Sequence, residues 1–197
     1  MIASASKKIS KILFQKNIIN ENEQEICQYG LEIILSTSVG ILLIVLIGII
    51  MHLLVESIVF YSVFVGVRFF TGGYHASSHF TCKLVLSLCC FTVLFISKEF
   101  YELFNFGIQS LILLMSFITI YLFAPIEHSD APVEAKTKIM NRRISILLSL
   151  TLSVIISIRY LIINKLSIVI DLTMLVISIL LIIAKLKERS DENEYAS

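Results

Sequence analysis

A glycine pair, a histidine and a cysteine stand close together between two strongly apolar runs of the chain. Gly72 and Gly73 are followed by His75, and Cys82 begins the next apolar run. A cysteine attacks a carbonyl only as its thiolate, which a neighbouring histidine can generate by accepting the thiol proton. These residue types therefore indicate nucleophilic cysteine chemistry at the end of an apolar segment.

Two histidines could act as the base. In a continuous helix His79 would lie three residues before Cys82, about 5 to 6 Å away at Cβ, whereas His75 would be roughly 10 Å away along the axis. Helical spacing therefore favours His79. Gly72 and Gly73, however, favour a turn over a continuous helix. A chain that turns back there could bring His75 to Cys82. Both His75 and His79 therefore remain candidates for the base.

The flanking residues favour a thiolate at Cys82. Serine and threonine residues just before it could cap a helix that starts there, and a helix N-terminus stabilises negative charge. Lys83 and Arg68 are cations nearby. His75, His79 and Cys82 could also supply three zinc ligands, but their spacing is not that of a standard zinc motif. We predict neither a metal nor another cofactor.

Composition defines the class of protein. Hydrophobic residues make up 57% of the 197 residues and charged residues only 16%, which excludes an ordinary soluble domain. Because a spanning helix needs about 20 mostly apolar residues, we predict an all-α polytopic membrane protein with about six such helices. They are predicted over residues 31–53, 55–70, 82–98, 107–124, 144–163 and 166–184. The polar segment between the second and third is predicted to be a re-entrant or irregular loop. The chain is thus divided into a cytoplasmic segment 1–30, a membrane domain 31–184 and a charged cytoplasmic tail 185–197.

The first predicted segment, residues 1–30, lacks the apolar core and cleavage site of a signal peptide. Within it Ile9, Ile12 and Leu13 lie at helical spacing, with lysines on the remaining face. This pattern is typical of an amphipathic helix that lies on an anionic leaflet. A basic flank that only sets topology is an equal alternative.

Lysine and arginine are distributed unevenly along the predicted membrane protein. Cytoplasmic segments carry an excess of both residues. One side of the chain carries most of them, namely Lys7, Lys8, Lys11, Lys16, Arg68, Lys83, Lys136, Lys138, Arg142, Arg143, Lys185, Lys187 and Arg189. The opposite side carries only Lys98 and Lys165, so both termini and the Gly-His loop are predicted to face the cytoplasm. Disulfides are rare there, and free thiols are expected at Cys27, Cys82, Cys89 and Cys90.

The last two predicted spans are joined by Asn164 and Lys165, so they should form a tight antiparallel hairpin. Arg159 and Asp171 would then lie at similar depths near its outer end. Because an unpaired charge inside a membrane is costly, we predict that these two residues pair.

Arg68, the run Gly72-Gly73-Tyr74-His75-Ala76 and Cys82, placed between the second and third spans, resemble the accessory gene regulator B (AgrB) family. The later Ala124-Pro125-Ile126, with a second proline and a basic run, also resembles that family, so the resemblance covers most of the chain. It implies a membrane-embedded cysteine endopeptidase of the bacterial cell membrane. Such an enzyme would cut a quorum-sensing propeptide on the cytoplasmic side through a cysteine thioester and promote its cyclisation to a thiolactone or lactone signal peptide.

The resemblance also implies roles for individual residues. Cys82 would be the nucleophile and His75 its base, and Arg68 and Gly73 would be further functionally important positions. The resemblance implies no role for His79, which stays the weaker candidate for the base. Two further sets of residues are weaker candidates on the cytoplasmic side. Glu127 and Asp130 are carboxylates that could orient the histidine. The second set is a basic run that could bind an acidic propeptide tail or only set topology, and it consists of Lys136, Lys138, Arg142 and Arg143.

The partners implied are a small amphipathic AgrD-like propeptide and the lipid bilayer, with no nucleic acid. Gly40 and Gly48 in the first span permit close helix packing, which leaves a homo-oligomer open. The alternative function is a small transporter or export protein whose polar loop is re-entrant. Cleavage of the propeptide would separate the two.

Overall fold

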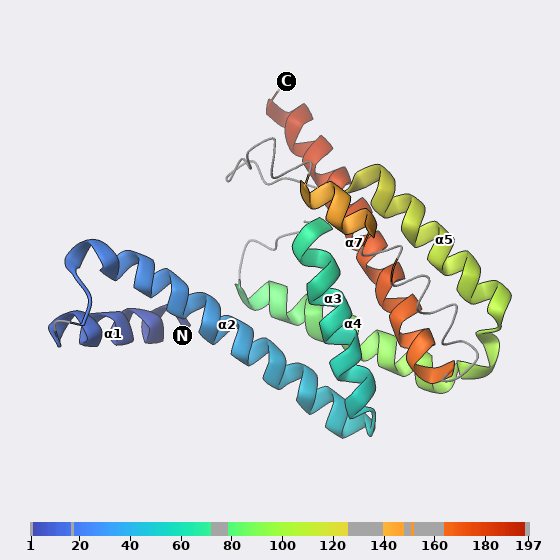
Figure 1. Ribbon diagram of the computed structural model, residues 1–197, viewed down its shortest axis with the longest axis horizontal. Helices are drawn as coiled ribbons and strands as arrows, with labels where there is room; N and C mark the ends of the chain where they lie inside the picture. Colours follow the sequence, from blue (N-terminus) through green and yellow to red (C-terminus); the bar gives the residue numbers. More distant parts are fainter. Residues whose placement is uncertain are drawn as a thin grey trace.

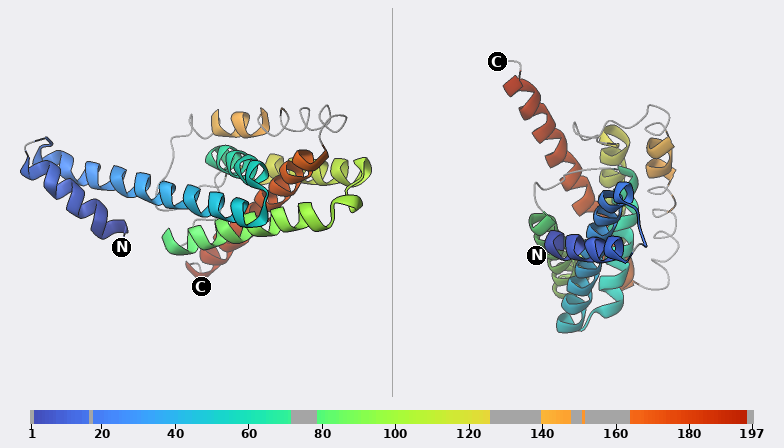
Figure 2. Two further views of the ribbon diagram at one scale, coloured as in Figure 1. Left: turned by 90° about the horizontal axis from the view of Figure 1, so that it is seen from below. Right: turned by 90° about the vertical axis from the view of Figure 1, so that its left-hand side faces the viewer.

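In the computed structural model, the described part of the chain consists of helices joined by short connections (Figures 1 and 2). The structure describes residues 2–16, 18–71, 79–125, 140–147, 151 and 164–195. Its elements are α1 (Ile2–Gln15), α2 (Glu21–Met51), α3 (Leu54–Thr71), α4 (His79–Glu99), the 3₁₀ turn η1 (Tyr101–Leu103), α5 (Phe106–Phe123) and α7 (Asn164–Tyr195). Residues 140–147 form a further helical segment. Among these described residues, five helices are long and apolar enough to cross a membrane, which confirms the all-α polytopic class.

The spanning helices α2, α3, α4, α5 and α7 correspond to the first four and the sixth of the predicted spans. The fifth, over residues 144–163, falls mostly outside the described residues, and so do residues 72–78 of the loop predicted between the second and third spans. α7 extends beyond the apolar run into the predicted tail. There the ammonium of Lys185 donates to Glu188 Oε2 at 2.7 Å, a pair at the spacing that supports an exposed helix.

α1 is the predicted amphipathic helix, and it packs against α2. The buried side chains on α1 are Ser6 and Ser10, whose small size lets the two helices approach closely. Ile9 and Ile12, by contrast, are 37% and 50% exposed. α1 therefore keeps an apolar face that α2 does not cover, and its contact with a leaflet stays a prediction.

α3 packs against α2, α4 and α7. Its buried residues recur every three or four positions, the period of one helix face, and they are Ser57, Phe60, Phe64, Val67 and Thr71. The rings of Phe60 and Phe64 stack with centroids 5.4 Å apart. Because this buried stripe fixes the rotation of α3, it also fixes the direction of Arg68 in its last turn.

α2 and α3 meet in a tight turn near Lys98, at the end of α4 opposite to Cys82. His52 has a φ of 58° and ends α2 in the left-handed conformation, while the N–H of Leu53 donates to the carbonyl oxygen of Gly48 at 2.8 Å. A Cβ added to Gly48 would lie 2.8 Å from the Cβ of Ser57 in α3. The close packing expected of Gly48 is therefore used inside the chain, between consecutive helices.

Gly48→Ala should destabilise the protein by about 1–3 kcal/mol, because overpacking a tight contact forces the backbones apart. Ser57 is fully buried and has no room to move away. Gly40→Ala is the matched control on the same helix, since its added Cβ would make an ordinary contact 3.7 Å from Leu86. Thermal unfolding in detergent measures both variants. Equal unfolding midpoints would contradict the tight α2–α3 contact.

Candidate functional site

Cys82 lies at the start of a membrane-spanning helix. It is the fourth residue of α4, and its side chain is half-buried. The first four N–H groups of a helix have no partner within that helix, and together with the helix dipole they favour negative charge nearby. Cys82 therefore combines partial access with a place in the first turn of a spanning helix.

The rest of α4 shows which way Cys82 faces. Leu86, Cys89 and Val93 follow it at intervals of four, three and four residues, so the four side chains share one face of the helix. Val93 is buried in the core of the bundle, with Leu86 and Cys89 packed against that core. Cys82 thus lies on the inward stripe of α4, one turn from the cytoplasmic end that we predict.

Arg68 approaches the same face of α4 from α3. Its side chain is half-buried, and its guanidinium carbon lies 5.5 Å from the centroid of the Phe64 ring, within the range of a cation–π interaction. The guanidinium is also close enough to the thiol of Cys89 for the two groups to interact electrostatically. Arg68 therefore brings a positive charge to the inward face of α4 at the level of Cys89, seven residues beyond Cys82.

α3 and α4 are separate helices, as the glycine pair predicts. α3 ends at Thr71 and α4 begins at His79, and the two helices run in different directions in Figure 1. His79 and Cys82 share the first turn of α4, which agrees with their predicted spacing, although the side chain of His79 is not described. Gly73 and His75 lie outside the described residues, so the approach of His75 to Cys82 stays a prediction.

The other predicted site residues fall into two groups. Glu127, Asp130, Lys136 and Lys138 lie outside the described residues. Arg142 and Arg143 lie in the helical segment over residues 140–147, and both are exposed. The guanidinium carbon of Arg142 is 5.8 Å from the centroid of the Tyr121 ring. This contact holds the end of the basic run against the last turn of α5.

The remaining cysteines differ from Cys82 in their surroundings. Cys90 is fully buried, Cys89 packs against the core and Cys27 lies near the start of α2. None of these four described cysteines forms a disulfide. Of the three cysteines on α4, only Cys82 lies in the first turn.

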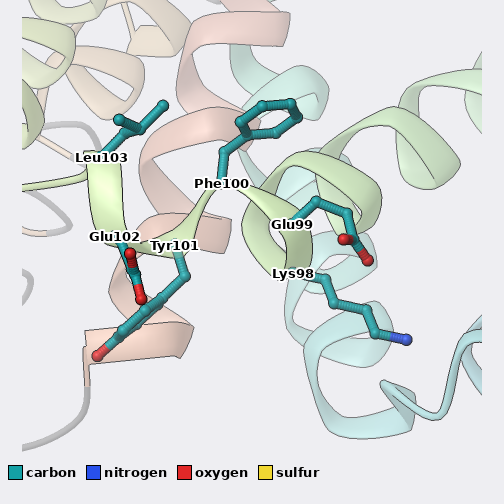
Figure 3. A pocket seen from close by; sticks show the side chains of 6 residues that line it. All are labelled: Lys98, Glu99, Phe100, Tyr101, Glu102 and Leu103. Carbon is teal, nitrogen blue, oxygen red and sulfur yellow. The ribbon is translucent and has the colours of Figure 1, made fainter.

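A pocket of about 420 Å³ lies at the other end of α4, where the chain turns through η1 toward α5. It is lined by residues 98–103, shown in Figure 3. The polar ends of Lys98 and Glu99 point away from the Tyr101 hydroxyl and the Glu102 carboxylate, so the polar groups of the six residues drawn do not converge. Lys98 is sixteen residues beyond Cys82, about 24 Å along a helix. This pocket is therefore separate from the cysteine site.

The fold and the site define a polytopic helical membrane protein with a half-buried cysteine at the start of a spanning helix. The family model described as Accessory gene regulator B matches residues 6–185. The chain belongs to this family, which confirms the resemblance seen in the sequence and supports a role in accessory gene regulator quorum-sensing processing.

Two curated relatives are similar over most of their length. A putative AgrB-like protein of Clostridium perfringens (strain SM101 / Type A) is 28% identical over 170 residues, which are 83% of this chain and 78% of the relative. Putative AgrB-like protein 2 of Clostridium perfringens (strain 13 / Type A) is 28% identical over 145 residues, 70% of this chain and 67% of that relative. No solved structure matches this chain.

Proposed function

We propose that this protein is a membrane-embedded cysteine endopeptidase that cuts a quorum-sensing propeptide on the cytoplasmic side. Cys82 is its nucleophile and His75 its base. One observation supports the assignment above the others: Cys82 is half-buried in the first turn of α4, on the inward face that Arg68 also approaches. Partial access and a helix N-terminus are two of the conditions that favour a reactive thiolate.

The proposed reaction has two acyl transfers. The Cys82 thiolate attacks a propeptide carbonyl, a carbon–sulfur bond forms and the peptide carbon–nitrogen bond breaks. The leaving amine takes the proton that His75 accepted from the thiol. A thiol or hydroxyl in the retained part of the peptide then attacks the thioester, closes the ring and releases Cys82. Because the acyl group is already held on the sulfur of Cys82, a good leaving group, the ring-closing step needs no separate activation by ATP.

Water is the competing nucleophile, since its attack on the thioester gives a linear product. A site at the membrane interface is partly shielded from bulk water, and the inward direction of Cys82 on α4 favours that shielding. We propose that Arg68 stabilises charge near the reacting carbonyl and that Gly73 permits the chain to turn between α3 and α4. His79 stays the weaker candidate for the base, and Glu127 or Asp130 would orient His75.

The proposed orientation puts the start of α4, the end of α3 and both termini in the cytoplasm of a bacterial cell membrane. The excess of lysine and arginine at these ends supports it. The propeptide would then reach Cys82 from the side on which it is synthesised. An AgrD-like propeptide is the partner that family membership implies.

A transporter with a re-entrant loop is the competing function, and purified protein in nanodiscs separates the two. A nanodisc holds a bilayer but encloses no compartment, so a transporter has no substrate to move across it. We expect a synthetic propeptide to be cut into two fragments, observed by mass spectrometry. A propeptide that stays intact with protein that is folded and binds it would overturn the endopeptidase.

The basic run should contribute to binding of the propeptide, because an acidic peptide tail is attracted to a cluster of cations. Replacing Lys136, Lys138, Arg142 and Arg143 with glutamine should raise KM roughly tenfold and leave kcat nearly unchanged. The wild-type KM should also rise with salt, since exposed charges are screened. Arg142 and Arg143 are exposed on the segment held against α5, where a peptide can reach them.

The matched control for the basic run replaces Lys185, Lys187 and Arg189 at the end of α7 with glutamine. Protease accessibility confirms that both sets of variants keep the wild-type topology. If KM is unchanged by loss of the basic run, those cations serve only to orient the protein in the membrane.

A further inference from the structure

The described part of the chain contains four buried side-chain oxygen atoms without a hydrogen-bond partner. They are Gln109 Oε1, Ser116 Oγ and both carboxyl oxygens of Asp171. Gln109 and Ser116 lie on α5 and Asp171 on α7, and these two helices pack against each other. We call the contact between α5 and α7 the seam. Because a buried polar atom without a partner is costly in a membrane, the oxygen atoms gathered at this seam should have a hydrogen-bond donor.

The register of the seam brings two of these groups to the same level. α5 and α7 run in the same direction and lie side by side (Figure 1). They touch where Ser178 Oγ, which donates to the carbonyl oxygen of Met174 at 2.9 Å, also lies 3.4 Å from the carbonyl oxygen of Ser116. Gln109 precedes Ser116 by seven residues, and Asp171 precedes Ser178 by seven. Seven residues make two helical turns, so Gln109 and Asp171 share the facing sides of the seam at one depth.

The amide of Gln109 has a defined orientation. Its Nε2 donates to the carbonyl oxygen of Phe104 at 3.0 Å, just outside the cap that Asn105 forms on α5 by accepting from the N–H of Ile108. Oε1 is therefore the free end of the amide, and Gln109 is only 2% exposed. Asp171 is fully buried. An amide oxygen and a carboxyl group that face each other repel unless one hydrogen lies between them.

The helices around Asp171 carry few cations. α5 contains no charged residue. On α3 the charged residues are Glu56 and Arg68, near opposite ends, and on α4 they are Lys83, Lys98 and Glu99, again near the ends. Lys98, in the last turn of α4, donates to the carbonyl oxygen of Met51 at 3.4 Å. The predicted partner Arg159 lies outside the described residues, and no ion pair of Asp171 is found within the described part of the chain.

We propose that the α5–α7 seam contains a proton-binding site, in which Asp171 is held as the neutral acid and donates its hydrogen to Oε1 of Gln109. The shared hydrogen satisfies an oxygen on each helix and avoids burying a carboxylate. It also gives α5 a specific partner, which matters in lipid because apolar surfaces alone do not select one helix over another. This site is separate from Cys82 and does not depend on the endopeptidase proposal.

Infrared spectroscopy of the protein in nanodiscs tests the site directly. The wild type should show the carbonyl stretching band of a protonated carboxylic acid, and Asp171→Asn should lack it. Asparagine also donates a hydrogen from nearly the same place, so Asp171→Asn should keep the unfolding midpoint of the wild type. Asp171→Ala should lower the midpoint by roughly 5 °C, because it leaves Gln109 Oε1 without a partner. Exchanging the pair in the double variant Gln109→Asp/Asp171→Gln should recover most of that loss.

Three results would overturn the proposal. One is an infrared difference spectrum in which Asp171→Asn removes no acid band. Another is a large loss of stability in Asp171→Asn that Arg159→Gln reproduces, which is the signature of an ion pair. The third is a wild-type midpoint that rises with Na⁺ while that of Asp171→Asn does not, which would make the bound ligand a metal cation.

Discussion

Replacing Cys82 with alanine should abolish cleavage of the propeptide, lowering the single-turnover rate by at least about 1,000-fold. The variant removes the atom that forms the thioester, so no later step can compensate for it. Cys82 is only half-buried at the end of α4, and its loss should therefore leave the fold intact. The measurement is mass spectrometry of a synthetic propeptide incubated with purified protein in nanodiscs.

Cys27→Ala is the matched control for Cys82→Ala. Both thiols are half-buried, and both lie near the predicted cytoplasmic end of a spanning helix. Cys27→Ala should keep the wild-type rate. A Cys82→Ala protein that still cuts the propeptide at the correct bond would rule out Cys82 as the nucleophile.

His75→Ala should lower the rate of cleavage by about 100- to 10,000-fold, the usual contribution of a general base. His79→Ala should have a much smaller effect, although His79 is the histidine that shares the first turn of α4 with Cys82. The two variants are each other's control, because both remove an imidazole from the same end of the bundle. Single-turnover rates in nanodiscs compare them, after unfolding midpoints show that both proteins are folded.

Imidazole added to the buffer should restore part of the activity of His75→Ala and none of that of Cys82→Ala. A merely structural role of His75 would not produce this recovery. If His79→Ala loses the activity and imidazole rescues that variant instead, the base is His79. The prediction that the chain turns to bring His75 to Cys82 would then be wrong.

The spans of this protein could be predicted from its sequence because apolar length is the main requirement for crossing a bilayer. α3 and α5 match their predicted spans closely, and the glycine pair marked the end of α3. Hydropathy does not show where a helix ends once it has left the membrane. α2 therefore starts well before residue 31, and α7 continues past residue 184, where Lys185 pairs with Glu188.

Contacts between helices were harder to predict, because a helical period shows which face is buried but not what buries it. Gly48 was recognised as a close-packing residue, but its partner Ser57 follows from the tight turn at His52. Gln109 cannot be singled out from the sequence, because a single glutamine in an apolar run belongs to no motif. Its significance comes from the register of α5 against α7.

For the candidate site, the sequence predicts that Cys82 lies at the start of a helix. The structure adds that Cys82 continues the inward stripe of α4 and that Arg68 approaches this face of α4 at Cys89. Position 82 could be singled out because a cysteine that follows serine and threonine residues is recognisable as the start of a helix. The direction of the Arg68 side chain could not be predicted, because it depends on the rotation of α3, which the buried stripe containing Phe60 and Phe64 fixes.

The most direct test of the central claim is the intact mass of the protein during cleavage. The substrate is a propeptide in which the thiol or hydroxyl that closes the ring has been removed, so the thioester can only hydrolyse. We predict a transient increase in mass equal to the N-terminal fragment, carried by Cys82, absent in Cys82→Ala and released by hydroxylamine. Complete cleavage by the wild type without an adduct at any time, or the same adduct on Cys82→Ala, would contradict an acyl-enzyme at Cys82.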